Sequence, residues 1–198
     1  MANEGQITGR LDAISEAVRK AGDGLPPVHL WNPPYCGEID MRIGADGTWY
    51  YQKTLIGRPA LVKLFASVLK REEGRYYLVT PVEKCGIVVD DAPFTAVEVR
   101  REDSPAGPVL RFRTNVGEEI ACGPEHKLRF ERQETSGGYK PYLHVRRDLW
   151  AKATRPVYYD LVELGEQREV DGVMWFGVRS QGEFFQIAPA DEVEDLTD

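Results

Sequence analysis

Two arginines at the starts of predicted helices are the residues of this sequence best suited to binding chemistry. Arg58 and Arg155 are each followed by a proline, which is favoured in the first turn of a helix. The backbone N–H groups at a helix start are free to bind an anion, and a guanidinium beside them adds to that attraction. Arg146 ends a predicted strand upstream of the second helix, and Arg42 is its counterpart in the first half. We therefore predict a small anionic ligand, with ordinary surface ion pairs as the alternative.

A proline-rich strap, residues 25–35, precedes these features. Its four prolines disfavour both helix and internal strand, so an extended, polyproline-like segment is expected. Trp31 and Asn32 would line a crevice there, since a stacked ring and an amide recognise a planar polar ligand. A rigid connector, or a proline-rich ligand for the groove of another protein, are the alternatives.

Carboxylates offer a third kind of chemistry. Asp160 and Glu163 are three residues apart and share one face of the second predicted helix, beside Tyr158. They fit an acid–base or metal pair, or simply a solvated helix face. An enzyme using Asp40, Glu83 or Asp160 as acid or base is therefore kept as an alternative function.

The common catalytic and cofactor motifs are absent from the sequence. It contains no Gly-x-Ser-x-Gly, no Walker loop and no Gly-x-Gly-x-x-Gly. Cys122 and His126 are close in sequence, but zinc needs three or four ligands and no second pair accompanies them. We predict no cofactor, no metal and no catalytic residues, and a catalytic Cys–His pair is kept as the minor alternative.

The net charge and the cysteines indicate which partners and which cellular compartment to expect. The 198 residues contain 25 Lys and Arg against 32 Asp and Glu, a net charge of −7, so nucleic-acid binding would need a local basic patch such as residues 127–155. The three cysteines lie far apart, which favours a reducing compartment. No signal peptide and no membrane span are recognised. We expect a soluble cytoplasmic protein that does not bind nucleic acid, and its oligomeric state is not predicted.

Hydrophobic periodicity predicts an α+β fold of two small modules. Strands are expected at 38–43, 48–52, 76–80, 86–90, 94–100, 109–113, 128–133, 141–145, 173–179 and 183–187, with helices near 11–21, 59–69 and 155–164. The predicted divisions are an N-terminal helical arm (1–24), the strap and first module (25–101), a linker (102–108), a second module (109–188) and an acidic tail (189–198). The two Arg-Pro helices, each set among strands, suggest internal duplication, with strand 39–42 resembling strand 143–146.

The strap and several later segments resemble a bacterial family, domain of unknown function 1285. The similar segments are Pro26–Pro34, Ile39–Ile43, Asp46–Trp49, Ile56–Pro59, Leu78–Lys84, Tyr142–Arg146 and Tyr158–Glu163. The resemblance implies two similar mixed α/β modules, the second superficially like a pleckstrin-homology fold. It implies no established reaction. It does imply a ligand site between the modules and a role in signalling. The candidate positions within its motifs are Trp31, Asn32, Asp40, Arg42, Arg58, Glu83, Lys84, Arg146, Tyr158 and Asp160.

The function expected from the sequence is therefore non-catalytic. We predict a ligand-binding or regulatory protein, with a small anionic ligand or nucleotide held between the modules by Arg58, Arg146 and Arg155, and with Trp31 or Tyr158 stacking on it. A protein-interaction module that uses the strap or the sheet edges is the first alternative. The carboxylate enzyme is the second.

Overall fold

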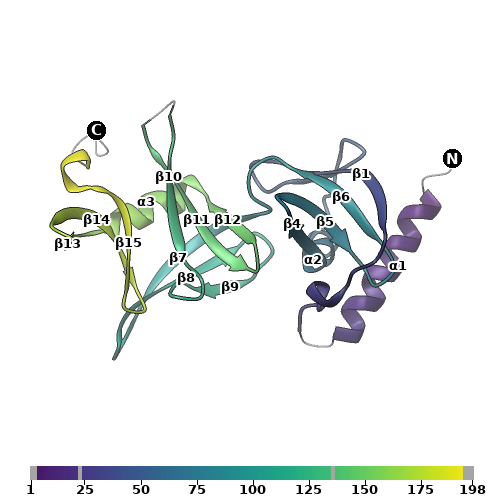
Figure 1. The fold of residues 1–198 in the computed structure, drawn as a ribbon, viewed down its shortest axis with the longest axis horizontal. Coiled ribbons are helices and arrows are strands. Elements are labelled where there is room, and N and C mark those ends of the chain that lie inside the picture. Colours follow the sequence, from purple (N-terminus) through teal and green to yellow (C-terminus); the bar gives the residue numbers. More distant parts are fainter. Residues whose placement is uncertain (1–3, 22–23, 135–136, 194–198) are drawn as a thin grey trace. The chain divides into compact units, whose positions relative to one another are not determined.

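The fold is described from a computed structural model, for residues 4–21, 24–134 and 137–193. The chain divides into two compact units, Met1–Asp91 and Ala92–Asp198. Strands hold 50% of the residues and helices 19%, so the protein is mostly β rather than an even α+β mixture. Most of the elements of each unit are labelled in Figure 1.

The first unit contains one six-stranded sheet in the order β3-β2-β1-β6-β5-β4. Its strands are β1 (Tyr35–Ile43), β2 (Trp49–Tyr51), β3 (Thr54–Leu55), β4 (Leu69–Glu72), β5 (Arg75–Val79) and β6 (Lys84–Val89). Strands β1 to β3 form one antiparallel meander and β4 to β6 another. The two meanders join where β1 runs parallel to β6, with Arg42 beside Val88.

Helices α1 (Glu4–Ala21) and α2 (Pro59–Ser67) belong to the same unit and pack on each other. The N-terminal helix expected from the sequence is present, and its residues Ile14 and Ala17 are buried against the unit. The indole of Trp49 is buried and stacks on the ring of Phe65 from α2, with 6.1 Å between ring centroids. The strap contains one short helical turn, η1 (Val28–Leu30), in an otherwise non-helical path.

The second unit contains a six-stranded sheet in the order β10-β11-β12-β7-β8-β9 and a three-stranded sheet in the order β13-β14-β15. The strands are β7 (Phe94–Ser104), β8 (Gly107–Thr114), β9 (Glu119–Ala121), β10 (Leu128–Arg132), β11 (Tyr139–Arg146), β12 (Leu149–Ala153), β13 (Glu166–Val170), β14 (Val173–Ser180) and β15 (Glu183–Pro189). Helix α3 (Arg155–Glu163) lies between β12 and β13 in the chain, and η2 (Ala190–Glu192) follows β15.

A buried serine joins the two sheets of this unit. Ser180, at the tip of the β14–β15 hairpin, accepts a hydrogen bond from the N–H of Leu110 in β8 at 2.8 Å. Its hydroxyl donates to the carbonyl of Cys122 at 2.6 Å. The next residue, Gln181, donates its N–H to the carbonyl of Pro108 at 2.9 Å. Because Ser180 is fully buried, these bonds hold the smaller sheet against the larger one away from competing water.

The two units have similar architecture, which suggests duplication. In each, a three-stranded antiparallel meander precedes the Arg-Pro helix and a second such meander follows it. The strand equivalence expected from the sequence shifts by one position. Residues 39–42 lie in the first strand of their meander, whereas residues 143–146 lie in the second strand of theirs.

The predicted linker is corrected by the structure. Residues 102–104 end β7 and residues 107–108 begin β8, so 102–108 is the tip of a hairpin rather than a link between modules. The Pro and Gly residues that indicated a linker serve a tight turn, where Gly107 adopts a φ of 114°. The boundary between the units lies instead after Asp91.

Candidate functional site

An apolar cavity of about 300 Å³ lies inside the first unit and is the strongest candidate site. Its walls come from α1, α2 and five strands of the sheet. The lining residues are Ile14, Ile39, Met41, Tyr51, Thr54, Leu55, Ile56, Gly57, Arg58, Leu61, Phe65, Leu78, Thr80, Glu83 and Cys85. Mostly hydrophobic walls with a few polar groups are typical of small-molecule sites.

Two of the predicted residues, Arg58 and Glu83, line this cavity. Arg58 stands at the start of α2, is exposed, and has no carboxylate partner among the described residues. Glu83 is half-buried on the turn between β5 and β6. The backbone N–H of Glu83 donates to the hydroxyl of Thr80 at 3.2 Å, and its carbonyl accepts from the N–H of Thr80 at 2.9 Å. These bonds fix the position of Glu83 beside the cavity.

A free thiol also lines the cavity. Cys85 of β6 is 2% exposed and forms no disulfide. It therefore offers a chemical reporter of the cavity interior. Cys36 is exposed elsewhere in the unit, so the two thiols have very different access to solvent.

The strap residues are held by a cluster of opposite charges. Lys70 donates a hydrogen bond to the carbonyl of Trp31 at 3.3 Å, and Trp31 is half-buried. Glu72 lies 2.6 Å from the Lys70 ammonium and 2.9 Å from that of Lys84. Hydrogen bonds from Lys70 and then Lys84 lower the pKa of Glu72. The structure thus places Lys84 in a structural cluster, while Asn32 is exposed.

Asp40 and Arg42 lie on β1 outside the cavity lining. Asp40 is exposed, and its backbone carbonyl accepts the N–H of Gln52 at 2.8 Å. Arg42 forms a two-pronged ion pair with Asp90, at 2.8 Å through Nε and 2.5 Å through Nη2. Arg42 holds the pKa of the Asp90 carboxyl below its ordinary value. Arg42 thus forms a surface ion pair, and its partner is Asp90.

Arg146 and Arg155 belong to the second unit and do not converge. Arg146 pairs with Leu149 at the start of β12, whereas Arg155 follows the end of that strand. Arg155 is six residues beyond Leu149, and β12 alone spans roughly 13 Å, four steps of about 3.3 Å. Arg146 lies 2.6 Å from Glu118, with its guanidinium 4.9 Å from the centre of the Phe94 ring. Arg155 donates to the hydroxyl of Tyr159 at 3.0 Å.

The remaining predicted side chains lie on α3 or near Cys122. Tyr158 is half-buried, and burial raises its pKa, whereas Asp160 and Glu163 are exposed. Burial raises the pKa of the Cys122 thiol to about 12, so the nucleophilic thiolate is disfavoured at neutral pH. His126 binds the carbonyl of His144 through Nδ1 at 3.1 Å. Within residues 4–21, 24–134 and 137–193, no cluster of three or more His, Cys, Asp or Glu could hold a metal.

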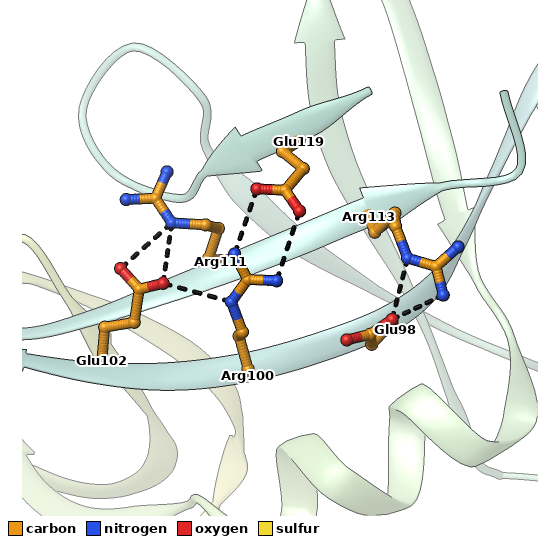
Figure 2. Close-up of polar contacts among 6 residues, drawn as sticks. All are labelled: Glu98, Arg100, Glu102, Arg111, Arg113 and Glu119. Atoms are coloured by element: carbon orange, nitrogen blue, oxygen red, sulfur yellow. Dashed lines mark hydrogen bonds and ion pairs between the residues drawn. The ribbon is translucent and has the colours of Figure 1, made fainter. Parts of the chain in front are cut away.

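The arginines of β7 and β8 form a ladder of ion pairs, shown in Figure 2. Arg113 binds Glu98, directly opposite on the neighbouring strand. Arg100 and Arg111 also face each other across the strands. Without a carboxylate between them, these two guanidinium groups would repel each other. Glu102 accepts hydrogen bonds from both at 3.1 Å, as the reader can follow in Figure 2. Arg100 also binds Glu119 at 3.0 Å, so three arginines face three carboxylates. Hydrogen bonds from Arg100 and then Arg111 lower the pKa of Glu102.

Profiles of one family match both units. The domain of unknown function DUF1285, N-terminal domain, matches residues 26–92, and the protein of unknown function DUF1285, C-terminal domain, matches residues 93–187. The chain belongs to the DUF1285 family. The family boundary at residues 92 and 93 falls within one residue of the boundary between the two units.

Two crystal structures of DUF1285 family proteins are similar to this chain. One, from Silicibacter pomeroyi DSS-3, is 48% identical, with 91% of this chain and 97% of that chain covered and a TM-score of 0.80. The other, from Shewanella baltica OS155, is 31% identical, with 63% of this chain and 91% of that chain covered and a TM-score of 0.50. No match was found among curated proteins. Within the described parts of this DUF1285 chain, no helix is long and apolar enough to cross a membrane.

Sequence reasoning missed most of the cavity wall in this DUF1285 protein. Met41, Phe65, Leu78 and Cys85 are apolar positions of strands and a helix, and none of them is among the candidate site residues of the sequence analysis. Core residues and cavity residues share the same periodicity, so the pattern alone does not separate them. The useful signal was the Thr-Pro-Val-Glu-Lys segment, because its turn carries Glu83 to the cavity.

Proposed function

We propose that this protein is a non-catalytic, ligand-binding regulatory protein whose ligand enters the cavity of the first unit. The single observation that carries the proposal is the cavity itself, about 300 Å³ with almost entirely apolar walls. That volume is at the lower end of the roughly 300–1,000 Å³ usual for ligand sites. The ligand class is a small hydrocarbon-like molecule with an anionic group.

Arg58 is the reason for expecting an anionic group on the ligand. Its guanidinium lies at the lining of the cavity and at the start of α2, where free backbone N–H groups also favour negative charge. Glu83 on the same lining would repel an anion, so the anionic group belongs on the Arg58 side. Apolar binding plus one charge-assisted contact gives recognition without requiring a reaction.

Three finer expectations remain predictions. They are the placement of a ligand between the two units, a role in signalling and the likeness of the second unit to a pleckstrin-homology fold. The similar order of meander, helix and meander in the two units supports descent by duplication. A protein-interaction role for the strap is favoured by one observation: Leu30 is 72% exposed.

Decanoate and decanol are suitable probes of the cavity. Decanoate is expected to raise the thermal midpoint, since a ligand bound only by the folded state stabilises it. It should also slow alkylation of Cys85, mapped by peptide mass, while leaving Cys36 reactive. Arg58→Gln should weaken decanoate binding several-fold and leave decanol unchanged.

A rim substitution gives the matched control. Leu55 lines the cavity and is 58% exposed, so Leu55→Trp should fill the cavity without disturbing the core. Val88 is 50% exposed on the same sheet but does not line the cavity, so Val88→Trp should bind as the wild type does. The proposal would be overturned if neither probe slows alkylation of Cys85. It would also be overturned if Leu55→Trp and Val88→Trp weaken decanoate binding equally.

A further inference from the structure

A second hollow, of about 470 Å³, lies beside the start of α3 within the second unit. It is lined by Gln133, Gly138, Tyr139, Lys140, Pro141, Lys152, Ala153, Arg155, Tyr158 and Tyr159. No Asp or Glu is among the described lining residues. In contrast to the apolar cavity of the first unit, most of the residues that line this hollow have side chains that donate hydrogen bonds.

Three cationic side chains reach the hollow from three different elements. Lys140 comes from β11, Lys152 from β12 and Arg155 from the start of α3. Lys152 lies opposite Tyr142 in the β11–β12 ladder, and Lys140 is two residues from Tyr142, so both lysines lie on the same face of the sheet. Lys140 also lies opposite Glu131 in the β10–β11 ladder, although Glu131 is not part of the lining. Ammonium and guanidinium groups that line one hollow in this way fit the oxygens of a phosphate.

Three tyrosines complete the lining. Burial raises the pKa of Tyr158, and the neighbouring hydroxyls of Tyr139 and Tyr159 raise it further, so this phenol remains a donor at neutral pH. Tyr159 is 51% exposed, and the Arg155 guanidinium lies 5.8 Å from the centre of its ring. An exposed ring beside a guanidinium is a surface on which a flat aromatic ligand stacks.

A carboxylate of the chain already lies near this hollow. Glu192 of η2 is 3.5 Å from the Tyr139 hydroxyl and 3.4 Å from the Arg132 guanidinium. It contacts Tyr139 without being part of the lining. Glu192 therefore brings one negative charge to the edge of this region.

We propose that the hollow binds a small phosphorylated molecule with a flat ring, of the class of a nucleoside monophosphate. The phosphate is recognised by Lys140, Lys152 and Arg155, and the ring by Tyr159. All of these residues lie in the second unit, so the site needs neither the cavity of the first unit nor any arrangement of the two units.

Calorimetric titration of the full chain with AMP, adenosine and inorganic phosphate tests this site. AMP is expected to bind at least tenfold more tightly than either of its parts. Arg155→Gln should weaken AMP at least tenfold, and Tyr159→Ala should weaken AMP while leaving phosphate unchanged. Arg179, an exposed arginine on β14 outside the hollow, provides the control variant Arg179→Gln, which should bind AMP normally.

The outcomes separate clearly. Equal affinity for AMP and adenosine would show that the phosphate is not recognised. Equal affinity for AMP and inorganic phosphate would show that the ring is not recognised. No AMP binding at millimolar concentration, or equal weakening by Arg179→Gln, would overturn the site. Decanoate binding in Arg155→Gln tests the first unit separately, so failure of one site is distinguished from failure of the other.

Discussion

The two candidate sites lie at the same kind of position, beside an Arg-Pro helix start. The residues that line them differ in polarity and in burial. In the first unit the cavity is walled by core residues such as Met41, Phe65 and Leu78, each at most 5% exposed. In the second unit the hollow is walled by half-buried or exposed tyrosine, lysine and arginine side chains. Similar architecture therefore does not impose a similar lining.

In the first unit this difference couples ligand binding to the stability of the fold. In the second unit it separates the two. A residue that both lines a cavity and fills the core cannot change without altering the packing of the fold. A residue that stands outside the core changes its contacts with a ligand at little cost to folding. The first site is thus tied to the integrity of its unit, whereas the second is free to vary.

Phe65→Ala should give the largest effect. Phe65 is 5% exposed, lines the cavity and stacks on Trp49, so truncation is expected to lower the free energy of unfolding by about 3–5 kcal/mol. Urea unfolding followed by tryptophan fluorescence measures the loss. Tyr159→Ala is the counterpart in the second unit and should change stability by less than about 0.5 kcal/mol. Similar losses in the two variants would break the comparison.

Ser180→Ala should give an intermediate effect, because the second unit joins its sheets through this hydroxyl. The substitution leaves the buried N–H of Leu110 and the carbonyl of Cys122 without their partner, at an expected cost of about 1–3 kcal/mol in the free energy of unfolding. Ser104→Ala, which removes an exposed hydroxyl bonded to Gly107, is the control and should be near neutral. A neutral Ser180→Ala would show that packing alone joins the sheets.

Glu72→Gln should give a smaller effect, about 1 kcal/mol at neutral pH, because its partners Lys70 and Lys84 are mostly shielded from water. The lysines lower the pKa of Glu72 in the folded state, so its stabilisation is present above the ordinary carboxyl pKa of 4.5 and is lost as the pH falls through the lowered value. Wild type and variant should therefore converge in acid, as measured by urea unfolding from pH 7 to pH 3.

The exposed ladder of the second unit sharpens that test. Glu102 also bridges two cations, but in solvent, so the effect of Glu102→Gln should be weaker and should fade in high salt. If Glu102→Gln costs more than Glu72→Gln at high salt, shielding from water does not decide the strength of these clusters.

Local signals in the sequence predicted much of the fold. The Arg-Pro helices, the strands on either side of residues 44–47 and the N-terminal helix are confirmed, because proline, turn glycine and periodicity act over a few residues. The predicted linker at 102–108 was wrong, since Pro and Gly punctuate hairpin tips as readily as domain boundaries.

Long-range pairing limited what could be predicted of the sites. Nothing local in β1 indicates that it runs parallel to β6, and this pairing brings Met41 and Cys85 to one cavity. In the second unit, Lys152 alternates with the buried Ala151 and Ala153 on a strand that was not predicted. The arginines were identified by their neighbours in the chain, whereas their partners were set by the topology.

The parallel pairing of β1 with β6 also determines when the first unit can fold. Local hairpins such as β4–β5 need only neighbouring residues, but β1 must wait for a strand that lies at the far end of the unit. On a ribosome, which delivers the chain from the N-terminus, α1, the strap and β1 emerge long before their sheet can close. The last residues of the unit therefore act as its closing step, and Asp90 secures them by donating its N–H to the carbonyl of Ile43.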